Sequence, residues 1–96
     1  VAFLSEKEDD EAEYVGMINA YGKLILPINY LAIQVLGNRR YAAQNSKGFW
    51  GLYDAVGNLI LPHEFTEIQP FQSGKSVAAK GHLYGLLGPN GETVLE

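Results

Sequence analysis

Residues 50–69 read WGLYDAVGNLILPHEFTEIQ, and residues 15–34, which lie 35 positions earlier, read VGMINAYGKLILPINYLAIQ. Nine positions are identical, among them two glycines, the Leu-Ile-Leu run and the proline that follows it. A third copy, YGLLGPNGETVLE, begins at Tyr84 at an offset of 34 and keeps both glycines in register. Self-similarity at a fixed period is the signature of a repeat architecture. The chain therefore contains three copies of one structural unit.

Each copy carries the pattern of a β-hairpin. The turns are predicted at Asn19–Gly22, Asp54–Gly57 and Gly88–Gly91, since Asp or Asn suits the first position of a type I turn and Gly the last. β-forming residues flank the middle turn at 49–53 and 59–61. Because proline cannot donate to a β-ladder, Pro27 and Pro62 are expected to end their strands. A further strand precedes each hairpin.

The predicted fold is all-β, with three tandem three-stranded antiparallel meanders stacked as an open, solenoid-like or curved array. We expect one repeat domain over residues 1–96. Its predicted parts are unit 1 at about 1–27 with an acidic loop at 5–13, a connector at 28–39, unit 2 at about 40–62, a connector at 63–75, and unit 3 at about 76–96. An aromatic-x-x-Ile element in each connector is expected to be extended and to pack on the meander. The alternative is a propeller-like fragment, although blades usually have four strands and at least four copies are needed to close.

The central strand of each unit is apolar on both sides. Alternate residues face opposite ways in a strand, so Trp50 and Leu52 lie on one side and Phe49 and Tyr53 on the other. Such a strand must be covered on both faces, as happens when repeats stack. An interior glycine otherwise weakens a strand, so we expect another segment to approach closely at three equivalent glycines. These are Gly16, Gly51 and Gly85.

Composition and charge exclude several classes of protein. The 96 residues include no cysteine, which removes a disulfide framework and a thiolate metal site. The net charge is −4, and six of the eleven acidic residues lie between residues 5 and 13. A basic footprint for nucleic acid is absent, and no apolar run approaches the roughly 20 residues of a membrane helix, so we expect neither nucleic-acid binding nor membrane insertion. Because the chain starts at Val1 without Met, it is expected to be a piece of a longer product.

The middle copy resembles the bacterial WG-repeat family, also called KWG repeats. The resemblance rests on the following motifs: Trp50-Gly51-Leu52, the Asp-x-x-Gly turn at 54–57, the apolar run ending in Pro62, the aromatic-x-x-Ile at 65–68, Pro-Phe-x-x-Gly at 70–74 and Val-Ala-x-Lys at 77–80. The first copy departs from the pattern with Val15 in the tryptophan position, and the third with Tyr84. The acidic stretch has no counterpart in it.

The resemblance implies a non-catalytic module that mediates protein–protein interaction or scaffolding in a bacterial protein. It also implies a location in the bacterial cell envelope or outside the cell, because many proteins with such repeats are exported. The alternative function is an envelope-associated module that binds glycans or the cell wall, which would require exposed aromatic side chains. The expected partner is accordingly a protein or a glycan, and the oligomeric state stays open.

Candidate reactive groups have structural explanations. Trp50 is expected in the core, because Val15 takes the same place in the first copy and valine cannot stack on a ligand. His63 and His82 occupy non-equivalent positions and are expected at the surface or in turns. The acidic stretch lacks the spacing and central glycine of a calcium loop. No nucleophile elbow, HExxH or phosphate-cradling loop is present, so we expect no enzyme, no catalytic residue, no metal ligand and no cofactor.

Two features are left as candidate partner contacts. Tyr21, Val56 and Asn90 share the third position of the three turns, so stacking would line them along one edge. Arg39 and Arg40 form a basic spot at the end of the first connector. Exposed aromatic and arginine side chains are good anchors at interfaces.

Overall fold

The chain folds into β-structure. The computed structural model describes residues 1–7 and 13–95, which contain eleven strands and no helix. The strands are β1 (Ala2–Lys7), β2 (Glu13–Ile18), β3 (Leu24–Tyr30), β4 (Ala32–Gly37), β5 (Arg40–Gln44), β6 (Trp50–Asp54), β7 (Leu59–Phe65), β8 (Glu67–Ile68), β9 (Ser76–Lys80), β10 (Leu83–Leu87) and β11 (Thr93–Leu95). The all-β prediction is confirmed.

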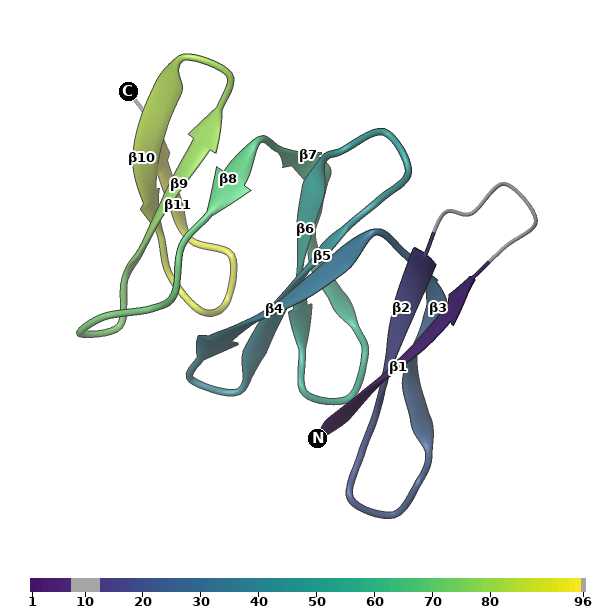
Figure 1. Ribbon diagram of the computed structural model, residues 1–96. Coiled ribbons are helices and arrows are strands. Elements are labelled where there is room, and N and C mark those ends of the chain that lie inside the picture. Colours follow the sequence, from purple (N-terminus) through teal and green to yellow (C-terminus); the bar gives the residue numbers. More distant parts are fainter. Residues whose placement is uncertain (8–12, 96) are drawn as a thin grey trace.

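The strands form three antiparallel sheets that follow one another along the molecule (Figure 1). Their orders are β1-β2-β3 for the first sheet, β4-β5-β6-β7 for the second and β11-β10-β9-β8 for the third. Within each sheet, strands that are consecutive in sequence pair with each other, so each sheet is a meander, and none of the three closes into a barrel. Three strands per unit is correct for the first sheet only, since the second and third sheets each have a fourth.

The fourth strands come from the segments predicted as connectors. In the segment 28–39, β4 pairs with β5 across a two-residue turn, Asn38-Arg39, with φ values of 53° and 59°. In the segment 63–75, β8 pairs with β9. Two-residue hairpin turns with positive φ at both positions usually carry Asn-Gly, so an arginine in the second position hides this turn from sequence patterns. The prediction of one extended piece at each aromatic-x-x-Ile element is correct only in part, because the chain bends at Leu31 and Thr66, where it passes from one sheet to the next.

The prediction that Pro27 and Pro62 end their strands is wrong. Leu61 pairs with Leu52 and Phe65 with Trp50, so β7 places three residues, 62–64, opposite the single Gly51. The same shift sets residues 27–29 of β3 opposite Gly16. Proline is accommodated at such an irregularity because its nitrogen needs no partner in the ladder.

The irregular segment lies directly over the glycine that it faces. A Cβ atom added to Gly51 would lie 3.0 Å from the imidazole ring of His63, and one on Gly16 would lie 2.8 Å from the side chain of Ile28. Only glycine leaves room for these side chains. The predicted close approach is therefore confirmed at both positions.

The second sheet is covered on both faces by the other two. On one face, its residues pack with those of the third sheet in a cluster formed by Leu36, Ala42, Leu52, Phe65, Ile68, Ala78 and Leu87. On the other face, they pack with those of the first sheet in a cluster formed by Met17, Leu26, Tyr41, Ala43 and Tyr53. The alternation along β5 and β6 thus sends consecutive residues into different clusters.

The acidic loop predicted at 5–13 is shorter than expected. Ser5, Glu6 and Lys7 belong to β1 and pair with Val15, Tyr14 and Glu13 of β2. The remaining residues of that prediction, 8–12, lie outside the described residues. The loop is shorter because β1 continues to Lys7, which pairs with Glu13, the first residue of β2.

The three repeated turns have the predicted geometry. Gly22, Gly57 and Gly91 have φ values of 80°, 90° and 91°, and the N–H of each donates to the carbonyl oxygen of the first turn residue. The second and third turns also lie against the preceding sheet. A Cβ atom on Gly57 would collide with the carbonyl oxygen of Ile25, and one on Gly91 would lie 3.1 Å from the side chain of Ile60.

The first prediction compares two turn glycines that share a conformation and differ in surroundings. Gly22→Ala should lower the free energy of unfolding by about 1 kcal/mol, because alanine is strained at positive φ. Gly57→Ala should lower it by about 1–3 kcal/mol more, because the added methyl group must push the turn away from β3. Urea unfolding of both variants measures the difference. Equal losses would contradict the contact between the second turn and the first sheet.

Candidate interaction surface

The last sheet exposes an apolar face. Val77 of β9 pairs with Leu86 of β10, and Ala79 pairs with Tyr84, so these four side chains share one side of the sheet. Tyr84 is 56% exposed and Leu86 45%, and Val77 is exposed beside them. The opposite side of the same sheet contributes Ala78 and Leu87 to the core. We call the exposed side, defined by Val77, Tyr84 and Leu86, the last face.

The positions that correspond to Leu86 in the other two sheets are buried. Leu86 corresponds to Leu52 and to Met17 in the repeat, and both of those side chains are 0% exposed. Leu52 is covered by the third sheet and Met17 by the second. The last face is therefore the same surface that forms both junctions inside the chain, left open at the third copy.

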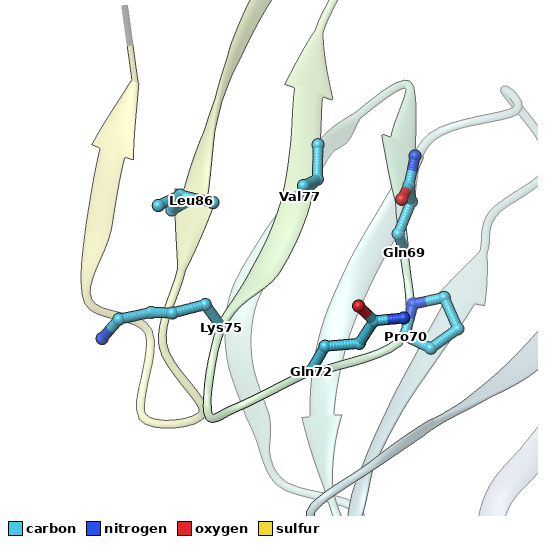
Figure 2. Close-up of a pocket in the computed structure, with 6 residues that line it drawn as sticks. All are labelled: Gln69, Pro70, Gln72, Lys75, Val77 and Leu86. Atoms are coloured by element: carbon cyan, nitrogen blue, oxygen red, sulfur yellow. The ribbon is translucent and has the colours of Figure 1, made fainter.

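A shallow pocket of about 220 Å³ opens on the last face. Figure 2 shows its lining, with Val77 and Leu86 on adjacent strands and the polar side chains around them. The polar part consists of Gln69, Gln72 and Lys75, and Pro70 completes the wall. Apolar strands with a polar rim are the usual anatomy of a protein interface.

The predicted partner-contact residues lie at one edge of the molecule. Tyr21 is 94% exposed, and Val56 and Asn90 are also exposed. Figure 1 shows the three turns that carry them, β2–β3, β6–β7 and β10–β11, at the same edge of the stack. The expected alignment of the turns is thus present, while binding of a partner there stays a prediction.

Arg40 and Asn90 meet each other in a contact within the chain. The Nε atom of Arg40 donates to the carbonyl oxygen of Pro89 at 2.6 Å, and an Nη atom donates to the side-chain oxygen of Asn90 at 3.1 Å. Arg40 begins β5, so this contact joins the second sheet to the last turn. The guanidinium therefore fastens one unit to the next. Arg39 is exposed in its turn, and its carbonyl oxygen accepts a hydrogen bond from Arg40.

Asp54 organises the middle turn beside Arg40. Its Oδ1 atom accepts hydrogen bonds from the backbone N–H groups of Val56 and Asn58. Desolvation alone would raise the pKa of Asp54, but the hydrogen bonds from Asn58 and Val56 and the charge of Arg40 hold it below its usual value. Asn19 makes the equivalent pair of bonds in the first turn. In the third turn Gly88 has no side chain, and a Glu92 carboxylate oxygen accepts from the N–H of Asn90 instead.

Trp50 lies half-buried against the core between the second and third sheets. It pairs with the buried Phe65 of β7, as expected for a core aromatic. The extension of that expectation to every copy is wrong, since the equivalent Tyr84 is exposed. The difference has a simple cause: a sheet follows Trp50, and none of the described residues covers Tyr84.

A polar cluster lies at the junction of the first two sheets. The hydroxyl groups of Tyr30 and Tyr53 are 3.0 Å apart, and the Tyr53 hydroxyl is 3.1 Å from Nε2 of His63. The rings of Tyr30 and His63 are stacked. The expectation that His63 sits at the surface or in a turn is wrong, because it lies half-buried in β7 over Gly51. Burial lowers the pKa of His63, and burial and the Tyr30 hydroxyl raise that of Tyr53.

Two further surveys cover the described residues. No group of three or more His, Cys, Asp or Glu side chains among them is arranged to hold a metal ion. The same residues include no helix of the length and apolar character that crossing a bilayer requires.

A comparison with known families finds a match to the middle copy. The family model described as WG containing repeat matches residues 50–82, from Trp50 to the turn after β9. Residues 50–82 are a WG repeat. The match confirms the resemblance seen in the Trp-Gly, Asp-x-x-Gly and Pro-Phe-x-x-Gly motifs. No curated protein and no solved structure matches the chain.

The matched WG repeat spans two sheets. It supplies β6 and β7 to the second sheet and β8 and β9 to the third. The characteristic Trp-Gly pair thus lies in one sheet, and the Pro-Phe-x-x-Gly segment leads into the next. Within that segment the N–H of Phe71 donates to the carbonyl oxygen of Leu36 at 2.6 Å, which ties the two sheets together.

The second prediction separates the roles of the two neighbouring arginines. Arg40→Ala should lower the free energy of unfolding by about 1–3 kcal/mol, because the charged guanidinium no longer donates hydrogen bonds to Pro89 and Asn90. Hydrogen exchange in residues 88–92 should speed up as well. Arg39→Ala, at an exposed side chain, is the control and should change stability by less than about 0.5 kcal/mol. Unchanged exchange in the last turn of the Arg40 variant would refute the contact.

The third prediction concerns pH. Because the pKa of His63 is lower in the folded chain than in the unfolded one, the unfolded chain binds the proton more readily. The stabilisation is therefore complete above the unfolded pKa of about 6.5 and is lost as pH falls below it toward the folded pKa. Thermal unfolding at a series of pH values from 7.5 to about 5 should show a falling melting temperature. His63→Gln should flatten this part of the profile, and His82→Gln should not; identical profiles for the two variants would contradict the assignment.

Proposed function

We propose that this WG-repeat chain is a non-catalytic module that works by protein–protein contact, as an interaction or scaffold unit in an open, solenoid-like array. The observation that carries the proposal is the last face. Val77, Tyr84 and Leu86 stand where the other two copies bind a neighbouring β-sheet. Because the equivalent surfaces of the other two copies pack on a sheet, the last face has the side chains that suit packing on another sheet.

The regularity of the two internal junctions supports the array. At each junction the side of a sheet that carries the Met17 or Leu52 position meets the opposite side of the following sheet. At each junction a turn glycine also lies on the isoleucine of the preceding Leu-Ile-Leu run. Contacts that repeat with the sequence period are the basis of linear repeat arrays. The four-stranded second and third sheets also have the size of propeller blades, and in a propeller built from further copies the last face would again bind a sheet.

The contacts of the polar groups support a role without catalysis. The half-buried hydroxyls of Tyr30 and Tyr53 and the imidazole of His63 bond to each other at a sheet junction. Arg40 is engaged by the last turn. These side chains hold the stack together, which is a structural task.

Glycan binding is the weaker alternative. It needs an exposed aromatic side chain on which a sugar can stack, and Trp50 packs against the core instead. Tyr84 is exposed, but its neighbours on the same face are Val77, Ala79 and Leu86. Aliphatic side chains suit another protein better than they suit the hydroxyl groups of a sugar. Titration with an N-acetylglucosamine oligomer, followed by tyrosine fluorescence, tests this alternative directly.

The fourth prediction tests the last face as a protein-binding surface. A second copy of residues 63–96, fused after Glu96, supplies the sheet that would follow. The free energy of unfolding should rise by about 2 kcal/mol, because Tyr84 and Leu86 become buried. Chemical denaturation of the 96-residue chain and of the fusion measures this gain.

The matched control is the same fusion carrying Leu86→Lys. This substitution puts a charge in the new junction, so it should remove most of the gain. In the 96-residue chain, where Leu86 is exposed, it should cost little. A fusion no more stable than the original chain would overturn the proposal that the last face binds a folded protein surface.

A further inference from the structure

We infer that the last face binds the first sheet of a second copy of this chain, so that copies associate head to tail. The inference rests on the proposed function and names the partner for the same surface. Three features carry it: the exposed side of the first sheet, the open turn at Gly22 and the position of Lys75.

The first sheet presents the surface that a preceding sheet would need. At the internal junctions, the side that docks on the preceding sheet carries the pairs Ala43–Gly51 and Tyr41–Tyr53 in the second sheet. The corresponding pairs in the first sheet are Leu4–Gly16 and Ala2–Ile18. Leu4 is 39% exposed, Ala2 is exposed and Ile18 is half-buried. We call this side, defined by Ala2, Leu4 and Ile18, the first face.

The two faces complement each other by the rule that governs the rest of the chain. Each internal junction joins a face of the last-face type to a face of the first-face type. Residues 1–7 and 13–95 form three sheets and two such junctions, so one face of each type is left exposed within this described part of the chain. Leu4 stands where the second and third sheets have Ala43 and Ala78. The larger side chain meets a face that retains an open pocket between Val77, Leu86 and Pro70.

The turn of the first sheet has free space at its glycine, unlike the turns of the other two sheets. Gly57 and Gly91 lie against Ile25 and Ile60 of the preceding sheet, whereas a Cβ atom on Gly22 would meet nothing within 4 Å. The strand position equivalent to Ile25 and Ile60 in the third sheet lies in β11, at residue 94. In the head-to-tail pair, the Gly22 turn of one copy comes to rest on β11 of the other.

Lys75 takes the place of Arg40 at the new junction. It lies 35 residues after Arg40 and directly before β9, which is the second strand of its sheet along the chain, as β5 is in the second sheet. Arg40 donates to the turn of the following sheet. Figure 2 shows the Lys75 side chain extended along the rim of the pocket. From there its ammonium group can donate to the carbonyl oxygens of the Asn19–Gly22 turn in the second copy.

Head-to-tail contact is heterologous, so it leaves one free face of each type on every assembly. The mass of the 96-residue chain should therefore rise with concentration beyond that of a dimer. Sedimentation equilibrium and light scattering at concentrations up to about 1 mM detect even weak association. Added salt should strengthen the association, because it screens the repulsion between copies of net charge −4 and does not weaken apolar contact.

The decisive experiment mixes two variants, Leu4→Lys on the first face and Leu86→Lys on the last face. Both side chains are exposed, so both variants should keep the melting temperature of the original chain. Each variant alone should be a monomer. The mixture should form a dimer and nothing larger, because the intact first face of the Leu86 variant binds the intact last face of the Leu4 variant.

Other results would overturn the inference. A chain that stays monomeric throughout excludes self-association. A Leu4→Lys variant that still associates, beside a monomeric Leu86→Lys variant, shows a symmetric contact between two last faces instead. Either result leaves the proposed function intact if the fused fourth sheet is stabilising, and a fused sheet without effect refutes the proposed function itself.

Discussion

The structure depends on one constraint: a sheet of three or four short strands, apolar on both faces, cannot cover itself. The second sheet meets this constraint by lying between the other two, with Leu52 buried on one side and Tyr53 on the other. Close stacking requires small side chains at the contact, which Ala42, Ala43 and Ala78 provide. The same need for close contact places turn glycines on the neighbouring sheet, since any larger residue there would hold the layers apart.

The WG repeat at residues 50–82 connects two neighbouring sheets, and this explains its glycine and proline positions in physical terms. Gly51 leaves room for the segment of β7 that contains Pro62 and His63, and that segment lets the strand continue to Phe65 and the core. The chain then enters the following sheet at once through β8. Each repeat therefore carries one side of a junction and the covalent link to the other side. Separation of two neighbouring sheets would strain this link and break the hydrogen bond from Phe71 to Leu36.

Much of the fold could be predicted from local chemistry. The turns at Asn19, Asp54 and Gly88 and the Leu-Ile-Leu strands follow from residue preferences that act over four or five positions. The fourth strand of the second sheet, β4, could not be predicted because the Asn38-Arg39 turn lacks the usual glycine. The full length of β7 could not be predicted because Pro62 suggested a strand end. Sequence reasoning also predicted that the three repeated turns share one edge, and Figure 1 shows them there. It missed Tyr84 and Leu86, since the repeat pattern equates them with the core positions of the middle copy.

The exposure of Tyr84 and Leu86 shows that the same repeat position is buried or exposed according to where its unit lies in the array. Val15, Trp50 and Tyr84 occupy one place in the repeat, and the first two lie at junctions while the third is exposed. The exposed face of the third sheet carries Val77, Tyr84 and Leu86, with polar side chains at the rim of its pocket. Exposure of this apolar surface has a cost in water, and burial under another sheet, as at the two internal junctions, would remove that cost.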